Sequence, residues 1–178
     1  SVQEIIDFKG ARNHARYSIN DFHLKDQEII EFAYSNAAYP LIESYLGDNV
    51  QLQHSVGWVS VPGVLKDSNF EFGFHMDISS WKWLNLFIYL EDVDDQNGPH
   101  SCISGTHNKR HFFSFLERRL SIERAKANYN ENDFMIFKGK KGTAIIEDTG
   151  NYHRAMPLKS KHRFMLQLTY SNFREING

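Results

Sequence analysis

The sequence predicts a mainly β protein, a double-stranded β-helix (jelly roll) with helices covering one outer face. From Gln51 onward, short apolar or alternating runs are separated by Gly, Pro, Asn and Asp, which is typical of many strands joined by turns. Before Gln51, apolar residues recur at helical spacing. With 178 residues, the chain suits one core rather than two ordinary domains. We therefore expect a single domain over 1–178, with a helical lead (1–50) and a jelly-roll core (51–171).

The helical pattern of the lead runs from residue 26 to residue 46. Asp26 suits the N-cap position, because its side chain can accept hydrogen bonds from the first backbone N–H groups, and Gly47 suits the end of the segment. Pro40 lacks a backbone N–H and should split the segment into two short helices. Another helix is expected over 109–127. Its apolar side would consist of Phe112, Phe113, Leu116 and Leu120.

Strands are expected near 51–61, 70–77, 83–90, 99–104, 133–137, 142–148 and 163–171. The last of these alternates clearly, because Phe164, Leu166, Leu168 and Tyr170 share one face. That apolar face should pack under the helices. Arg163 would then point into the barrel, where burial of an unpaired guanidinium is costly and an anionic ligand is its natural partner.

The composition favours a small-molecule partner. The chain has 20 basic and 22 acidic residues, a net charge of -2, which gives no general attraction to nucleic acid or to an anionic membrane. Its longest apolar stretches, such as 83–90, are far shorter than the ~20 residues of a membrane helix. Cys102 has no second cysteine with which to form an internal disulfide, and no signal-like segment is seen. We expect a cytoplasmic protein.

The residues with the clearest chemical meaning are His75 and Asp77, in Phe-His-Met-Asp. On a strand, residues two apart project from the same face and can share one ion. A His-x-Asp pair taken alone is more often a surface pair than a ligand set. A third candidate, His153, follows the predicted strand 142–148. Two His and one carboxylate form the facial triad that non-haem Fe(II) oxygenases use, which leaves coordination positions open.

The chain resembles the phytanoyl-CoA dioxygenase family of Fe(II)- and 2-oxoglutarate-dependent oxygenases. The resemblance covers residues 46–171. It rests on His75-Met-Asp77, residues 84–94, Asn97-Gly-Pro, Ser104-Gly-Thr-His107, and residues 147–153 followed by Arg163. Order and spacing together make these motifs specific.

The resemblance implies that His75, Asp77 and His153 bind Fe(II), and that Arg163 binds the distal carboxylate of 2-oxoglutarate. The implied reaction uses O₂ to hydroxylate a small-molecule substrate while 2-oxoglutarate is converted to succinate and CO₂. Halogenating relatives replace the carboxylate ligand with a small residue, so Asp77 argues against halogenation.

The chain departs from this family at Ala155, where some relatives place a hydroxyl that assists the cosubstrate. Strand alternation nominates Asn85, Gln167 and Thr169 as further 2-oxoglutarate-binding residues. The chain is also shorter than most members of the family.

Two alternative functions remain open. One is a non-catalytic, metal-containing jelly-roll or cupin-like binding module. The other is a cupin-like metal dioxygenase that needs no keto acid, in which Arg163 would serve the substrate. Trp81 and Trp83, close after the His75/Asp77 pair, could line the pocket mouth or belong to the core.

Overall fold

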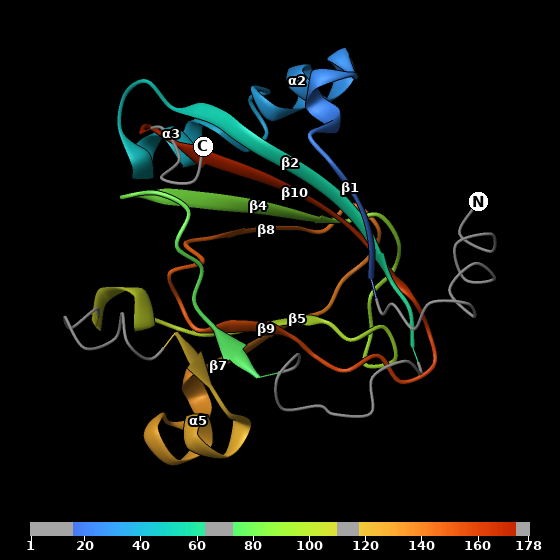
Figure 1. Cartoon of the computed structure of the whole chain (residues 1–178), viewed down its shortest axis with the longest axis vertical. Helices are drawn as coiled ribbons and strands as arrows, with labels where there is room; N and C mark the ends of the chain where they lie inside the picture. Colours follow the sequence, from blue (N-terminus) through green and yellow to red (C-terminus); the bar gives the residue numbers. More distant parts are fainter. Residues whose placement is uncertain (1–15, 63–72, 110–117, 174–178) are drawn as a thin grey trace.

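The computed structural model describes residues 16–62, 73–109 and 118–173, which form two facing sheets (Figure 1). The strands are β1 (Arg16–Asn20), β2 (Gln51–Ser60), β3 (Phe74–His75), β4 (Trp83–Tyr89), β5 (His100–Ile103), β6 (Arg119–Leu120), β7 (Phe134–Phe137), β8 (Ala144–Glu147), β9 (His153–Ala155) and β10 (Arg163–Ser171). The first sheet has the order β1-β2-β10-β4-β8 and the second has the order β6-β3-β9-β5-β7. All the named strand pairs are antiparallel. The predicted mainly β jelly roll is confirmed.

Two short helices precede β2, as the sequence predicts. Helix α2 (Gln27–Ala33) begins after Asp26, whose side chain accepts a hydrogen bond from a backbone N–H of the first turn. Helix α3 (Tyr39–Leu46) has Pro40 in its first turn, where the missing N–H costs no helical hydrogen bond. Gly47 ends α3 with a positive φ of 88°, a conformation that glycine adopts easily.

These helices cover the outer face of the first sheet. The predicted apolar face of β10 lies under them, with Leu168 and Tyr170 fully buried. The hydroxyl of Tyr170 donates to the carbonyl oxygen of Ala33 at 2.9 Å, which fastens α2 to β10. The shared core is formed by Ala33, Ala38, Ile42, Leu46, Val50, Leu84, Leu86, Ile88, Leu166, Leu168 and Tyr170.

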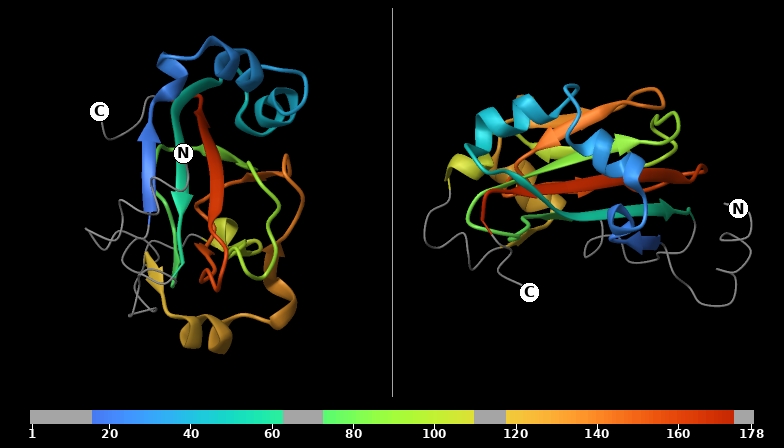
Figure 2. Two further views of the ribbon diagram at one scale, coloured as in Figure 1. Left: turned by 90° about the vertical axis from the view of Figure 1, so that its right-hand side faces the viewer. Right: turned by 90° about the horizontal axis from the view of Figure 1, so that it is seen from above.

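The prediction of one helix over 109–127 is wrong in part. Arg119 and Leu120 form strand β6, which pairs with β3, and helix α5 spans only Ile122–Asn128. Phe112, Phe113 and Leu116 lie outside the described residues. Leu120 and Ala125 pack together on the outer face of the second sheet, so a helix lies there as well. In the left view of Figure 2, α5 (gold) and the N-terminal helices (blue to cyan) lie at opposite sides of the sheets.

The sequence patterns did not predict β1, β6 or β9. Strand β1 lies inside the expected helical lead and pairs with β2 along the edge of the first sheet. Short 3-10 helices span Phe22–Leu24, Thr106–Lys109 and Glu131–Asp133. In the described part of the chain, no helix has the length and apolar character needed to cross a bilayer.

Part of the space between the sheets is apolar. Its core is formed by Val56, Trp58, Phe87, Tyr89, Val93, Ile145 and Met165, with Phe137 of β7 packed against them. Buried polar side chains share this interior, among them Asn85, His100, Glu147, His153, Arg163 and Thr169.

Candidate metal centre

His75 and His153 face each other from neighbouring strands of the second sheet. His75 ends β3 and His153 begins β9, and the two residues are direct cross-strand partners. Their ring centroids lie 4.3 Å apart. Direct partners in an antiparallel pair have side chains on the same face, so both imidazoles reach the same point inside the barrel.

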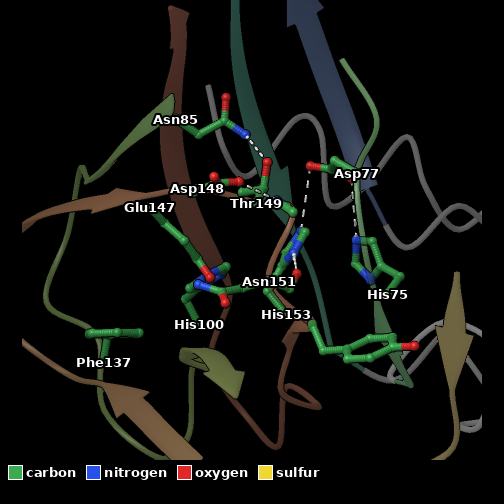
Figure 3. Close-up of polar contacts among 12 residues, drawn as sticks. His75, Asp77, Asn85, His100, Phe137, Glu147, Asp148, Thr149, Asn151 and His153 are labelled. Carbon is green, nitrogen blue, oxygen red and sulfur yellow. Dashed lines mark hydrogen bonds and ion pairs between the residues drawn. The ribbon is translucent and has the colours of Figure 1, made fainter. Parts of the chain in front are cut away.

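Asp77 completes this group from the segment that follows β3 (Figure 3). One carboxylate oxygen, Oδ1, lies 3.9 Å from Nε2 of His75, and the other, Oδ2, lies 3.5 Å from Nε2 of His153. One ligand atom from each residue lies within 4.8 Å of the other two. The structure thus brings together the three residues that the sequence nominated. Their two nitrogens and one oxygen form a donor set that could hold a divalent metal.

Backbone carbonyl groups orient both imidazoles. Nδ1 of His153 donates to the carbonyl oxygen of Asn151 at 3.0 Å, and the His75 imidazole hydrogen-bonds to the backbone of Gly73. Because a carbonyl oxygen only accepts, Nδ1 of His153 carries the proton and Nε2 presents its lone pair towards Asp77. The side chain of Asn151 is held in turn by the backbone N–H of His107 at 2.9 Å.

Thr149 positions Asp77. The backbone N–H of Asp77 donates to the carbonyl oxygen of Thr149 at 2.9 Å. The Thr149 hydroxyl accepts from Nε1 of Trp83 at 2.8 Å and from Nδ2 of Asn85 at 2.9 Å. Trp83 is therefore a buried residue with a structural hydrogen bond, whereas Trp81 is 82% exposed.

The surroundings keep His75 neutral. Burial lowers the pKa of His75 to about 4, the neighbouring His153 contributes in the same direction, and the carboxylate of Asp77 partly offsets both. A neutral imidazole at pH 7 has a lone pair available, which is the form that binds metal ions.

Arg163 points into the barrel, as the alternation of β10 predicts. It is only 3% exposed, and Nη1 donates to the carbonyl oxygen of Gly98. Gly98 has a positive φ of 65°. Arg154, next to His153, lies on the opposite face of its sheet, with its guanidinium 4.8 Å from the ring centroid of Phe74.

The three further residues nominated for 2-oxoglutarate are hydrogen-bonded to one another. Nε2 of Gln167 donates to the hydroxyl of Thr169 at 3.1 Å, and that hydroxyl donates to Oδ1 of Asn85 at 2.7 Å. This series of hydrogen bonds continues from the Asn85 amide to the hydroxyl of Thr149. A role of Asn85, Gln167 and Thr169 in cosubstrate binding stays a prediction.

Sequence reasoning missed a buried pair beside the metal centre, His100 of β5 and Glu147 of β8. Nε2 of His100 lies 2.5 Å from Oε2 of Glu147, and their side chains are 6% and 5% exposed. The ring of His100 lies 5.7 Å from that of His153. A signal was present, because Glu147 stands at an inward position of a short strand and His100 lies two residues from Cys102, on the same face of its strand.

Burial also shifts the pair towards its neutral forms. The pKa of Glu147 is raised to about 7, chiefly by burial. Burial and then the charge of Arg163 lower the pKa of His100 to about 3. The pair therefore places little negative charge beside Arg163.

No protein-family model and no curated protein sequence matches this chain. Solved structures match its fold. HygX from Streptomyces hygroscopicus, with nickel and 2-oxoglutarate bound, gives a TM-score of 0.65 at 10% identity, covering 96% of this chain and 79% of HygX. EctD from S. alaskensis, with 2-oxoglutarate and 5-hydroxyectoine, gives 0.64 at 20% identity, covering 86% and 55%.

SnoN, a non-haem alpha-ketoglutarate-dependent epimerase from nogalamycin biosynthesis, gives a TM-score of 0.62 at 15% identity, covering 88% of this chain and 61% of SnoN. The chain thus spans little more than half the length of EctD. At such low identities the likeness concerns the fold, and this chain has the jelly-roll fold of HygX, EctD and SnoN.

Proposed function

We propose that this chain is an Fe(II)- and 2-oxoglutarate-dependent dioxygenase of the phytanoyl-CoA dioxygenase type, which hydroxylates a small molecule. The observation that carries the proposal is the His75/Asp77/His153 group, whose ligand atoms lie within 4.8 Å of one another, in a barrel that also buries Arg163. HygX and EctD were solved with a metal or with 2-oxoglutarate, and the EctD structure also holds 5-hydroxyectoine.

The residues present fit such a metal. His75 is held neutral, His153 presents Nε2, and Asp77 supplies an anionic oxygen between them. Iron and 2-oxoglutarate, when bound, would supply O₂ activation, with the keto acid converted to succinate and CO₂ as the substrate gains a hydroxyl. Arg163 binds the distal carboxylate of 2-oxoglutarate. The side chains of His75 and Asp77 are 34% and 35% exposed, so the site is open on that side for a substrate to approach.

The substrate is a small molecule in the reducing cytoplasm, where the buried Cys102 stays a thiol. The proposed reaction is hydroxylation rather than halogenation, because Asp77 occupies the position that a halide would need. Anionic Asp77 also keeps the metal site at lower net charge.

The test is an anaerobic titration of the Fe(II)-loaded protein with 2-oxoglutarate, followed by the visible charge-transfer band of a chelated keto acid. Wild type should give the band, and Arg163→Ala should require a much higher 2-oxoglutarate concentration. Lys161→Ala is the matched control, because the exposed side chain of Lys161 pairs with Asp94 at 2.7 Å. Metal binding without the band would contradict the proposal and favour the binding module.

A further inference from the structure

The His100–Glu147 pair links the two sheets inside the barrel. His100 belongs to β5 of the second sheet and Glu147 to β8 of the first, and their contact of 2.5 Å is almost completely buried. Burying two ionisable groups costs free energy that burying a pair of apolar side chains would not. The pair therefore calls for an explanation beyond stability.

The His100 end of the pair lies near both the candidate metal centre and Arg163. The positive charge of Arg163 lowers the pKa of His100, and the negative charge of Asp77 raises it. The ring of His100 is tilted by 32° relative to that of His153, and the two ring centroids lie 5.7 Å apart. Gly98, two residues before His100, accepts the hydrogen bond from Arg163. A keto acid that joins the metal to Arg163 would therefore lie near His100.

The described side chains next to the His100 ring are apolar or already hydrogen-bonded. The hydroxyl of Tyr89 accepts from the backbone N–H of His100 at 3.0 Å and donates to the carbonyl oxygen of Phe137 at 2.8 Å. The cross-strand partner of His100 in β9 is Ala155, which carries only a methyl group. On the other side, the ring centroids of Phe87 and Phe137 lie 4.9 and 5.9 Å from that of His100. His100 is thus a polar side chain set among apolar ones, next to the buried guanidinium.

The hydrogen bond to Glu147 determines which nitrogen of His100 carries a proton. Burial favours the neutral forms of both residues. A neutral carboxyl group donates its O–H, and its contact of 2.5 Å with Nε2 suits such a strong bond. Neutral imidazole then has its one proton on Nδ1. His100 is thereby set up as a donor.

We propose that Nδ1–H of His100 donates to the distal carboxylate of 2-oxoglutarate beside Arg163, and that Glu147 is the positioning residue that holds His100 in this tautomer. The proposal rests on the proposed function. It makes His100 a determinant of specificity, because a keto acid without a distal carboxylate gains nothing from this hydrogen bond.

The test compares two keto acids by calorimetric titration of the Ni(II)-loaded protein without O₂. These are 2-oxoglutarate and 2-oxopentanoate, which has a methyl group in place of the distal carboxylate. His100→Phe keeps an aromatic ring but removes the donor, so the Kd for 2-oxoglutarate should rise about tenfold or more. The Kd for 2-oxopentanoate should not change. Ser101→Ala is the matched control, since Ser101 neighbours His100 but faces away from the interior.

Two variants at Glu147 test the same idea with His100 in place. Glu147→Gln can still donate an N–H to Nε2, so it should keep the preference for 2-oxoglutarate. Glu147→Leu cannot, and it should lose part of that preference. This comparison serves even where His100→Phe does not fold.

Each remaining outcome overturns the proposal in a distinct way. If His100→Phe binds 2-oxoglutarate as tightly as wild type, or if both keto acids weaken equally, the pair has only a structural role. In either case the proposed function stands. If wild-type protein binds Ni(II) but neither keto acid, the proposed function itself fails.

Discussion

The backbone N–H of Asp77 donates a 2.9 Å hydrogen bond to the carbonyl oxygen of Thr149. Thr149 also accepts two hydrogen bonds at its hydroxyl, from Trp83 and Asn85. One fully buried threonine therefore ties the carboxylate ligand to β4 of the opposite sheet. The position of the metal centre depends on the contact between the two sheets.

Thr149→Val should destabilise both the fold and the metal site. Valine has nearly the same shape but leaves the indole N–H of Trp83 and the amide of Asn85 without an acceptor, at about 1–3 kcal/mol for each buried donor. Valine keeps the backbone carbonyl that binds Asp77, but without the hydroxyl this carbonyl is no longer fixed to Trp83 and Asn85, so metal affinity should fall about tenfold. Urea unfolding and Ni(II) titration measure the two effects. Thr149→Ser keeps the hydroxyl and should restore most of both, whereas wild-type behaviour of Thr149→Val would show that Asp77 does not depend on it.

Divalent metal should stabilise the protein through the three ligands. A metal that binds only the folded state adds about 2.7 kcal/mol at a concentration one hundred times its Kd. Thermal unfolding with and without Ni(II) should show this gain in wild type and its loss in His153→Ala. His162→Ala is the control, because His162 pairs with Glu91 at 2.9 Å at the surface. A metal-dependent rise in Tm that survives in His153→Ala would place the metal elsewhere.

Gly98→Ala should lower the free energy of unfolding far more than Gly105→Ala does. Both glycines have positive φ, 65° and 74°, and alanine there costs about 1–2 kcal/mol. A Cβ on Gly98 would collide with the carbonyl oxygen of Met156, whereas no described atom lies within 4 Å of a Cβ on Gly105. Gly98 also holds Arg163, so its substitution should weaken 2-oxoglutarate binding as well. Urea unfolding of both variants checks the difference, and equal losses would refute the crowding argument.

Glu147 should make the metal-free protein less stable as the pH rises. Its pKa is about 7 in the folded state and 4.5 ordinarily, so the folded protein holds the proton more tightly. The resulting stabilisation is complete below pH 4.5 and is lost as the pH rises through about 7, up to about 3 kcal/mol in total. The charged or titratable groups that act on it are His153, Cys102, Asp77 and Asp148, with His100 in contact.

Urea unfolding at pH 5 and pH 8 compares wild type with Glu147→Gln, which cannot ionise. The loss of stability between these pH values should be larger in wild type. Identical pH dependence of the two proteins would mean that Glu147 is already ionised in the folded state at pH 5.

Local pattern was enough to predict most of the elements. The helices around Pro40 and the alternation in β10 depend on residues near one another in the chain, so their spacing carries the information. The region 109–127 was misread because β6 has only two residues and exists through its pairing with β3. Short strands such as β6 and β9 are too brief to show a period.

The sequence by itself determined which residue types form the candidate metal centre. His75 and Asp77 are two residues apart in an extended segment, and local geometry alone places both side chains on one face. Only the tertiary structure decided what surrounds them. The pairing of β4 with β8 brings Asn85 to Thr149, and the packing of the two sheets against each other brings His100 to Glu147. Such contacts join residues 47 and 64 positions apart, and no local period records which strands become neighbours.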